Sequence, residues 1–129
     1  MPRELINPPE LHPTPGFSHI AVPTGARLVF VAGQVALDRD FNVVGDSLTA
    51  QTKAAMENVG TALSAIGASF EDVVRRTIYT THPNEWETIA RAVEEVQGSD
   101  RNPPQTIVGV PGLALPELLI EIECTVSID

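Results

Sequence analysis

Residues 118–128, LLIEIECTVSI, are the stretch of sequence that decides the fold. Side chains of a strand alternate between its two faces, so the apolar residues at even positions from Leu118 to Ile128 share one face and predict a core strand. Glu121 and Glu123 lie on the other face. A carboxylate beside a core is stable only when it is solvated or hydrogen-bonded, and it is otherwise a candidate site. Glu121 is therefore either a site residue or a carboxylate at a wet subunit interface.

The composition is that of a soluble protein with one ordinary domain. The chain has 129 residues, of which 43% are apolar and 19% charged, and no apolar run approaches the roughly 20 residues that cross a bilayer. No secretory signal follows Met1, and the single Cys124 cannot form an internal disulfide, so we expect a cytoplasmic protein. Seventeen acidic against eight basic residues, a net charge of -9, disfavour nucleic acid and anionic membranes as partners.

Proline and turn signals divide the N-terminal half. Five prolines in residues 1–16 predict an extended arm rather than a packed element, and residues 17–129 then form a single domain. Residues 17–22 and 28–35 suit strands, and the turn signal Pro23-Thr24-Gly25 between them predicts a hairpin. The second of these strands is apolar at every position from Leu28 to Ala32, which indicates that both of its faces are covered.

Two amphipathic helices follow from the spacing of apolar residues. The first begins after an N-cap at Asp46 or Ser47 and stops at Gly67, and the second runs from Pro83 to Gly98. Residues 69–72 have the spacing of a capping box before a strand over 73–81, and residues 105–110 suit another strand. Two helices can cover only one face of a four- or five-stranded sheet, so we expect an α+β fold whose other sheet face packs against further copies of the chain.

Several segments together resemble the RidA family of reactive-intermediate deaminases, also called the YjgF family. They are VFVAGQVAL (29–37), QTKAAMENVGTALSAIGAS (51–69), VVRRTIYT (73–80), PPQTIVGV (103–110) and LLIEIECTV (118–126). The resemblance covers nearly the whole chain. It implies a chorismate-mutase-like fold with two helices on one face of a mixed sheet, assembled as a homotrimeric barrel with small-molecule clefts at the subunit interfaces. It also implies hydrolysis of 2-imino acids to 2-oxo acids and ammonia, without metal or cofactor.

The resemblance assigns roles to particular positions of this chain. Glu121 matches the glutamate that positions the attacking water, and Gly33 matches a glycine that lines the cleft. Gln105 and Thr106 occupy the places of the arginine and serine in the motif whose arginine grips the substrate carboxylate. The best-known branch of the family has tyrosine at the position of Phe17, serine at that of Ala32 and asparagine at that of Ala90. The chain therefore resembles an arginine-lacking Rid subfamily.

Loss of this arginine changes the ligand that we expect. A glutamine amide offers neutral donors and an acceptor instead of a charged fork, so we expect carboxylate binding to weaken by about tenfold or more. Without a cation at position 105 the cleft would be negative because of Glu121, which favours a neutral or cationic ligand. Two alternatives remain open. Arg101 could turn inward and replace the cation, or Gln105 could be an inert replacement in an inactive cleft.

Three functions are then compatible with the residues. The first is hydrolysis of an enamine, imine or related metabolite by a water that Glu121 directs. The second is a non-catalytic trimer that binds a metabolite, and the third, ribonuclease activity, fits poorly with the net charge of -9. His12, His19 and His82 have no ligand spacing, so no metal site is predicted. Cys124 shares the core face and is predicted to be a buried structural thiol.

Overall fold

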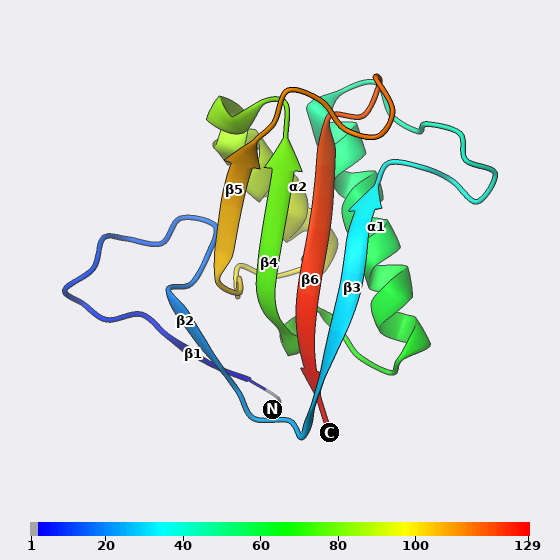
Figure 1. The fold of residues 1–129 in the computed structure, drawn as a ribbon. Helices are drawn as coiled ribbons and strands as arrows, with labels where there is room; N and C mark the ends of the chain where they lie inside the picture. Colours follow the sequence, from blue (N-terminus) through cyan, green and yellow to red (C-terminus); the bar gives the residue numbers. More distant parts are fainter. Residues whose placement is uncertain (1–2) are drawn as a thin grey trace.

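A mixed four-stranded sheet, with both long helices packed on one of its faces, forms the body of the molecule (Figure 1). This computed structural model describes residues 3–129. The elements, in chain order, are β1 (Arg3–Ile6), β2 (Ile20–Pro23), β3 (Arg27–Val35), α1 (Leu48–Ala65), the 3₁₀ turn η1 (Phe70–Asp72), β4 (Val73–Thr80), the 3₁₀ turn η2 (Pro83–Glu85), α2 (Trp86–Gln97), β5 (Gln105–Gly109) and β6 (Ile120–Ile128). The predicted α+β architecture is confirmed.

The C-terminal strand β6 is an inner strand of the sheet. The strand order is β3-β6-β4-β5; β6 runs antiparallel to both of its neighbours, whereas β4 and β5 are parallel. Because β6 has a partner on each side and helices beneath it, Ile120, Ile122 and Val126 are fully buried. The even positions of this strand thus form the core face that the alternation predicted, while Glu121 and Glu123 lie half-buried on the other face.

Capping residues mark the predicted start of α1 and the predicted end of α2. The helix α2 itself begins at Trp86, after the 3₁₀ turn η2, and not at the predicted Pro83. The Ser47 hydroxyl accepts a hydrogen bond from the Ala50 N–H over 3.1 Å, which satisfies a free donor in the first turn of α1. Gly98 ends α2 in the left-handed region at φ +78°, which favours glycine. The capping box of Ser69 and Asp72 is also present, so the chain turns sharply into β4.

The predicted hairpin between residues 17–22 and 28–35 is wrong. β2 pairs with β1, with Ile20 opposite Ile6, and β3 pairs with β6 over its whole length. The nine-residue strands β3 and β6 form a longer ladder than β3 could form with the four-residue strand β2, which favours the observed pairing. Gly25 lies between β2 and β3, where the chain passes from the small sheet to the large one. A Cβ on Gly25 would lie 2.5 Å from the Ile128 carbonyl oxygen, so only glycine fits this crossing.

The expectation that residues 1–16 contain no packed element is also wrong for residues 3–6. The Arg3 side chain of β1 is buried and donates hydrogen bonds to the Val73 and Arg101 carbonyl oxygens, and it pairs with Glu71 over 3.2 Å. These contacts fasten the small sheet to the start of β4. The first two residues of the predicted arm lie outside the described residues, and the division at residue 16 stays a prediction.

Among residues 3–129, no helix or strand covers the sheet face opposite the helices (Figure 1). Phe30 and Leu28 of β3 point from this face with 76% and 51% of their surfaces exposed. The inference that both faces of β3 are covered therefore holds for the helix face alone, and cover of the other face by further copies stays a prediction. Within residues 3–129, none of the helices combines the length and apolar character that crossing a membrane requires.

Candidate functional site

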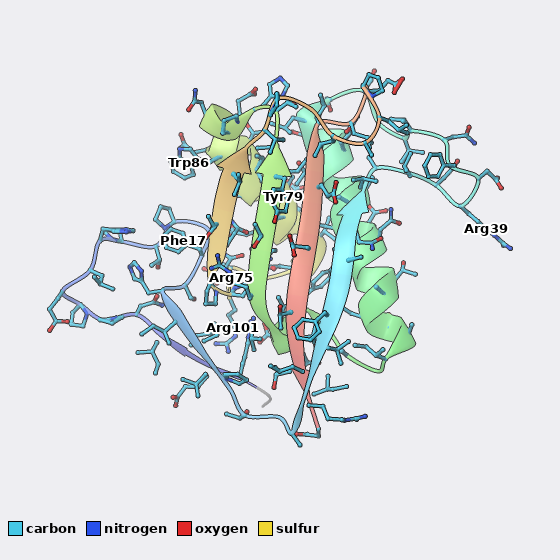
Figure 2. All side chains as sticks on the ribbon, viewed as in Figure 1. Phe17, Arg39, Arg75, Tyr79, Trp86 and Arg101 are labelled. Carbon is cyan, nitrogen blue, oxygen red and sulfur yellow. The ribbon has the colours of Figure 1, made fainter. Side chains whose placement is uncertain are left out.

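A cleft of about 390 Å³ lies beside the edge strand β5, between the N-terminal loop and the start of α2. His12 and Phe17 line it from the loop, Trp86 and Ala90 line it from α2, and Gln105 does so from the first position of β5. Figure 2 shows Phe17 and Trp86 along this outer edge of β5. The wall is largely apolar, so the Gln105 amide is a polar group that would orient a bound molecule.

Local contacts hold the N-terminal loop at the cleft. The Ser18 hydroxyl donates to the Asn102 carbonyl oxygen over 2.6 Å, and the Ser18 N–H donates to the Pro103 carbonyl oxygen over 3.1 Å. The Phe17 ring also packs edge-on against the His19 ring with 5.5 Å between centroids. Because residues 102 and 103 lead directly into β5, these contacts bring Phe17 and Gln105, two of the residues expected in a cleft, to one wall.

Arg76 of β4 lies directly behind Gln105. The two residues are partners in the parallel ladder, so their side chains share a face of the sheet, and Arg76 Nε donates to Gln105 Oε1 over 2.6 Å. An arginine has only donors, so the atom of Gln105 that meets it must be the carbonyl oxygen. The Gln105 amide nitrogen therefore points away from Arg76, and within residues 3–129 no acceptor is hydrogen-bonded to it.

The surroundings of Arg76 are neutral amides rather than carboxylates. The Gln97 and Asn102 side-chain oxygens accept from its two terminal nitrogens, each over 3.1 Å, and Arg76 is only 2% exposed. Within residues 3–129 no carboxylate lies within 4.0 Å of this guanidinium; Glu94 is reached through the Asn102 amide. Burial lowers the pKa of Arg76 to about 10, so the side chain still carries its charge at neutral pH.

A buried cation thus lies behind the cleft, although Arg76 does not line it and position 105 itself carries no charge. Arg101 does not supply this cation: Arg101 Nε donates to Glu71 over 2.8 Å, the side chain is half exposed, and Figure 2 places it below the start of β5, far from Trp86. Sequence reasoning missed Arg76. The signal was available, because Arg76 shares its side of the strand with Ile78 and Thr80, so one of the two adjacent arginines had to face the core.

Glu121 and Gly33 meet on the other face of the sheet. Between the pairs Val31–Cys124 and Gln34–Ile122, the strand β3 contains one extra residue, which makes a β-bulge at Ala32 and Gly33. A Cβ on Gly33 would lie 2.0 Å from Glu121 Oε2, so the carboxylate rests directly on the glycine backbone. Within the described part of the chain this carboxylate accepts no hydrogen bond, and Ala32 beside it is exposed.

Glu123, by contrast, is engaged in the sheet. The Tyr79 hydroxyl donates to Glu123 Oε1 over 2.5 Å, and this hydrogen bond raises the pKa of Tyr79. Thr106 lies on the same face, where its hydroxyl accepts from Arg75 over 2.6 Å. Arg75 and Tyr79 are drawn on the helix-free face in Figure 2. Thr106 therefore does not line the cleft beside its neighbour Gln105, and Glu123 has a structural partner.

The predicted site residues form two groups in one chain. Phe17 and Gln105 line the cleft at the β5 edge, whereas Gly33 and Glu121 lie on the opposite face near the β3 edge. Register explains the separation: Gln105 is opposite Arg76, Glu121 is opposite Tyr79, and residues three apart on β4 point to opposite faces. Among residues 3–129, no group of three or more His, Cys, Asp or Glu side chains is placed to hold a metal ion.

Comparison with known proteins places this geometry in a family. Residues 8–128 match the family model described as Endoribonuclease L-PSP. The chain is 33% identical over 96 residues to a RutC family protein of Pyrococcus abyssi, covering 74% of each chain. It is 34% identical over 88 residues to the RutC family protein YjgH of Escherichia coli, covering 67% of this chain and 66% of that one.

Solved structures agree with the sequence matches. YyfB of Yersinia pestis, described as a Rid-family protein of unknown function, superimposes with a TM-score of 0.91 at 36% identity, over 99% of this chain and 100% of that one. A YjgF-family protein of Mycobacterium tuberculosis has a TM-score of 0.68 at 30% identity, over 98% and 99% of the two chains. The chain therefore belongs to the Endoribonuclease L-PSP family, whose members are also called RutC, YjgF and Rid proteins, as its motifs predicted.

Proposed function

We propose that the chain is a homotrimeric enzyme that hydrolyses an enamine, an imine or a related small metabolite, with Glu121 directing the attacking water. The observation that carries the proposal is the Glu121 carboxylate, which lies against the Gly33 backbone with no hydrogen-bond partner among residues 3–129. A carboxylate in this state is available to a water molecule and a substrate. Glu123, two residues along on the same face, already accepts a hydrogen bond from the Tyr79 hydroxyl.

Hydrolysis of an imine requires a group that acts first as a general base and then as a general acid. Glu121 takes a proton from water as the water oxygen adds to the imine carbon, and it passes this proton to the imine nitrogen, which gives a carbinolamine. The carboxylate then takes the proton of the carbinolamine hydroxyl and delivers it to the nitrogen as the C–N bond breaks, so ammonia leaves and a carbonyl product remains. One imine and one water therefore give one carbonyl compound and one ammonia, and no cofactor takes part.

Trimer formation would unite the two groups of site residues. In a single chain the cleft with Phe17 and Gln105 lies at the β5 edge, whereas Glu121 lies against Gly33 near the opposite edge, on the face without helices. Figure 1 shows that β5 and β3 are the two outer strands of the sheet. We infer that the β5 edge of one copy meets the β3 edge of the next and that the helix-free faces turn inward. Phe30, 76% exposed on that face, would then be buried.

The substrate preference should differ from that of family members with an arginine at position 105. Gln105 presents neutral N–H donors where those proteins present a charged guanidinium, and Phe17 has an aromatic ring but no hydroxyl group. Endoribonuclease activity, which the family description names, is disfavoured by the net charge of -9.

Hydrolysis is tested with imines generated in place from a panel of amino acids and amines, following the release of ammonia. Turnover of at least one imine by the wild type, with a loss of about 10²-fold or more in Glu121→Gln, is expected for a general acid–base residue. Glu123→Gln is the matched control, since it keeps an acceptor for Tyr79 and should retain most of the rate. Equal rates in wild type and Glu121→Gln would exclude the role of Glu121.

The alternative, a trimer that binds a metabolite without turning it over, uses the same largely apolar cleft. It predicts ligand binding by the wild type, retained in Glu121→Gln, with no release of ammonia from any imine of the panel. Native mass spectrometry of the purified protein distinguishes the two, because a binding protein would carry a co-purified ligand that survives unchanged.

A further inference from the structure

The sequence places no cation at the ligand position, yet the structure places one immediately behind it. Gln105 lines the cleft, and its carbonyl oxygen accepts a 2.6 Å hydrogen bond from Arg76 Nε. We propose that Arg76 is a positioning residue that determines specificity: it holds Gln105 so that the amide N–H groups face the cleft and bind an acceptor oxygen of the ligand. The ligand class is then a small molecule that presents a carboxylate or carbonyl oxygen to Gln105.

The orientation of Gln105 follows from donor and acceptor chemistry. A guanidinium cannot accept a hydrogen bond, so a reversed amide would set donor against donor at 2.6 Å, and the bond would be lost. Two further amides fix the guanidinium itself, since Gln97 and Asn102 accept from its terminal nitrogens. Arg76 is thus held on three sides, and Gln105 has one orientation that satisfies it.

The positive charge of Arg76 also favours binding of an acceptor oxygen by Gln105. The guanidinium is 2% exposed and has no carboxylate within 4.0 Å among residues 3–129, so its charge is screened weakly by water and balanced only through the Asn102 amide, which donates to Glu94. On the cleft side the next group is Gln105. A cation bonded to the amide oxygen polarises the amide and makes its N–H groups stronger donors. An oxygen that carries negative charge gains most from these donors.

At this cleft an anionic or carbonyl oxygen of the ligand is therefore favoured, and a cationic ligand group, which the sequence allowed, is disfavoured. This proposal rests on the proposed function only for the location of the cleft, and it makes no use of hydrolysis. The net charge of -9 would by itself favour a cationic ligand, so a preference for an anion at this cleft must come from a local group.

Two probes of equal chain length, butanoate and butylamine, test the inference by NMR titration of the ¹⁵N-labelled full chain. We expect butanoate to bind at least about tenfold more tightly than butylamine, and to shift the side-chain amide signals of Gln105. In Arg76→Met this preference should fall about tenfold or more. Arg75→Met is the matched control, because it removes the same charge one residue away, where Arg75 contacts Thr106 on the other face; the preference should stay at the wild-type value.

A second variant keeps the test decisive if Arg76→Met does not fold. Gln105→Glu keeps an acceptor for Arg76 but removes the donors that face the cleft, so it should fold and lose butanoate binding. The inference is overturned if the wild type prefers butylamine or binds neither probe, if Arg75→Met and Arg76→Met change the preference equally, or if Gln105→Glu binds butanoate as the wild type does. Turnover is measured separately, so an inactive protein that prefers butanoate would contradict the proposed hydrolysis and leave this inference standing.

Discussion

The substitution Gly33→Ala should displace the Glu121 carboxylate without changing the stability of the fold much. The added Cβ would lie 2.0 Å from Glu121 Oε2 and 2.8 Å from its Cδ and Cγ atoms. An ordinary contact begins at 3.4 Å, so the oxygen must retreat by 3.4 − 2.0 = 1.4 Å. Because all three atoms belong to a flexible side chain, the carboxylate can swing away while the backbone stays in place.

Two magnitudes follow from this geometry. Gly33 has no positive φ, so alanine adopts its backbone conformation, and the free energy of unfolding should change by no more than about 1 kcal/mol. Displacement of a catalytic group by about 1 Å can cost on the order of 10² in rate. We therefore expect Gly33→Ala to be folded and nearly as stable as the wild type, with imine hydrolysis reduced by about 10²-fold.

The assay pairs urea denaturation with the rate of ammonia release from the best imine of the panel. Gly112→Ala is the matched control, since nothing lies within 4 Å of a Cβ at that position and its φ is not positive. It should match the wild type in both measurements. A wild-type rate in Gly33→Ala would refute the role of the Glu121 position, and a loss of stability above about 3 kcal/mol would refute the view that only the side chain moves.

Three further predictions concern the fold and the assembly. Ser47→Ala should lower the free energy of unfolding by about 1 kcal/mol in urea denaturation, because the first turn of α1 loses its cap. Cys124 is 5% exposed and burial raises its pKa to about 11, so about one thiol in a thousand is ionised at pH 8; a disulfide reagent should label it only in denaturant, and rapid labelling of the native protein would contradict this. Phe30→Asp should convert the proposed trimer to a monomer in sedimentation velocity, whereas Phe41→Asp, at a loop residue 68% exposed, should leave the assembly unchanged.

Local signals were sufficient for most of the elements, although not for β1. The N-cap at Ser47, the stop at Gly98 and the two-residue alternation of β6 all depend on neighbours within one turn or one strand, and the structure confirms each of them. The family could also be recognised from its motifs, because they lie in continuous segments. The sequence alone therefore identified the two helices, the core strand and Glu121 as a candidate.

Pairing between distant segments was decided by the tertiary structure. The strand β2 pairs with β1 rather than with β3. Arg76 lies next to Gln105 because of the register between β4 and β5. A shift of one residue in a strand moves every side chain to the other face, and no local signal specifies that shift. The strand LLIEIECTVSI itself is read from sequence as one core face and two glutamates, whereas only the fold shows that Glu121 rests on Gly33 and Glu123 on Tyr79.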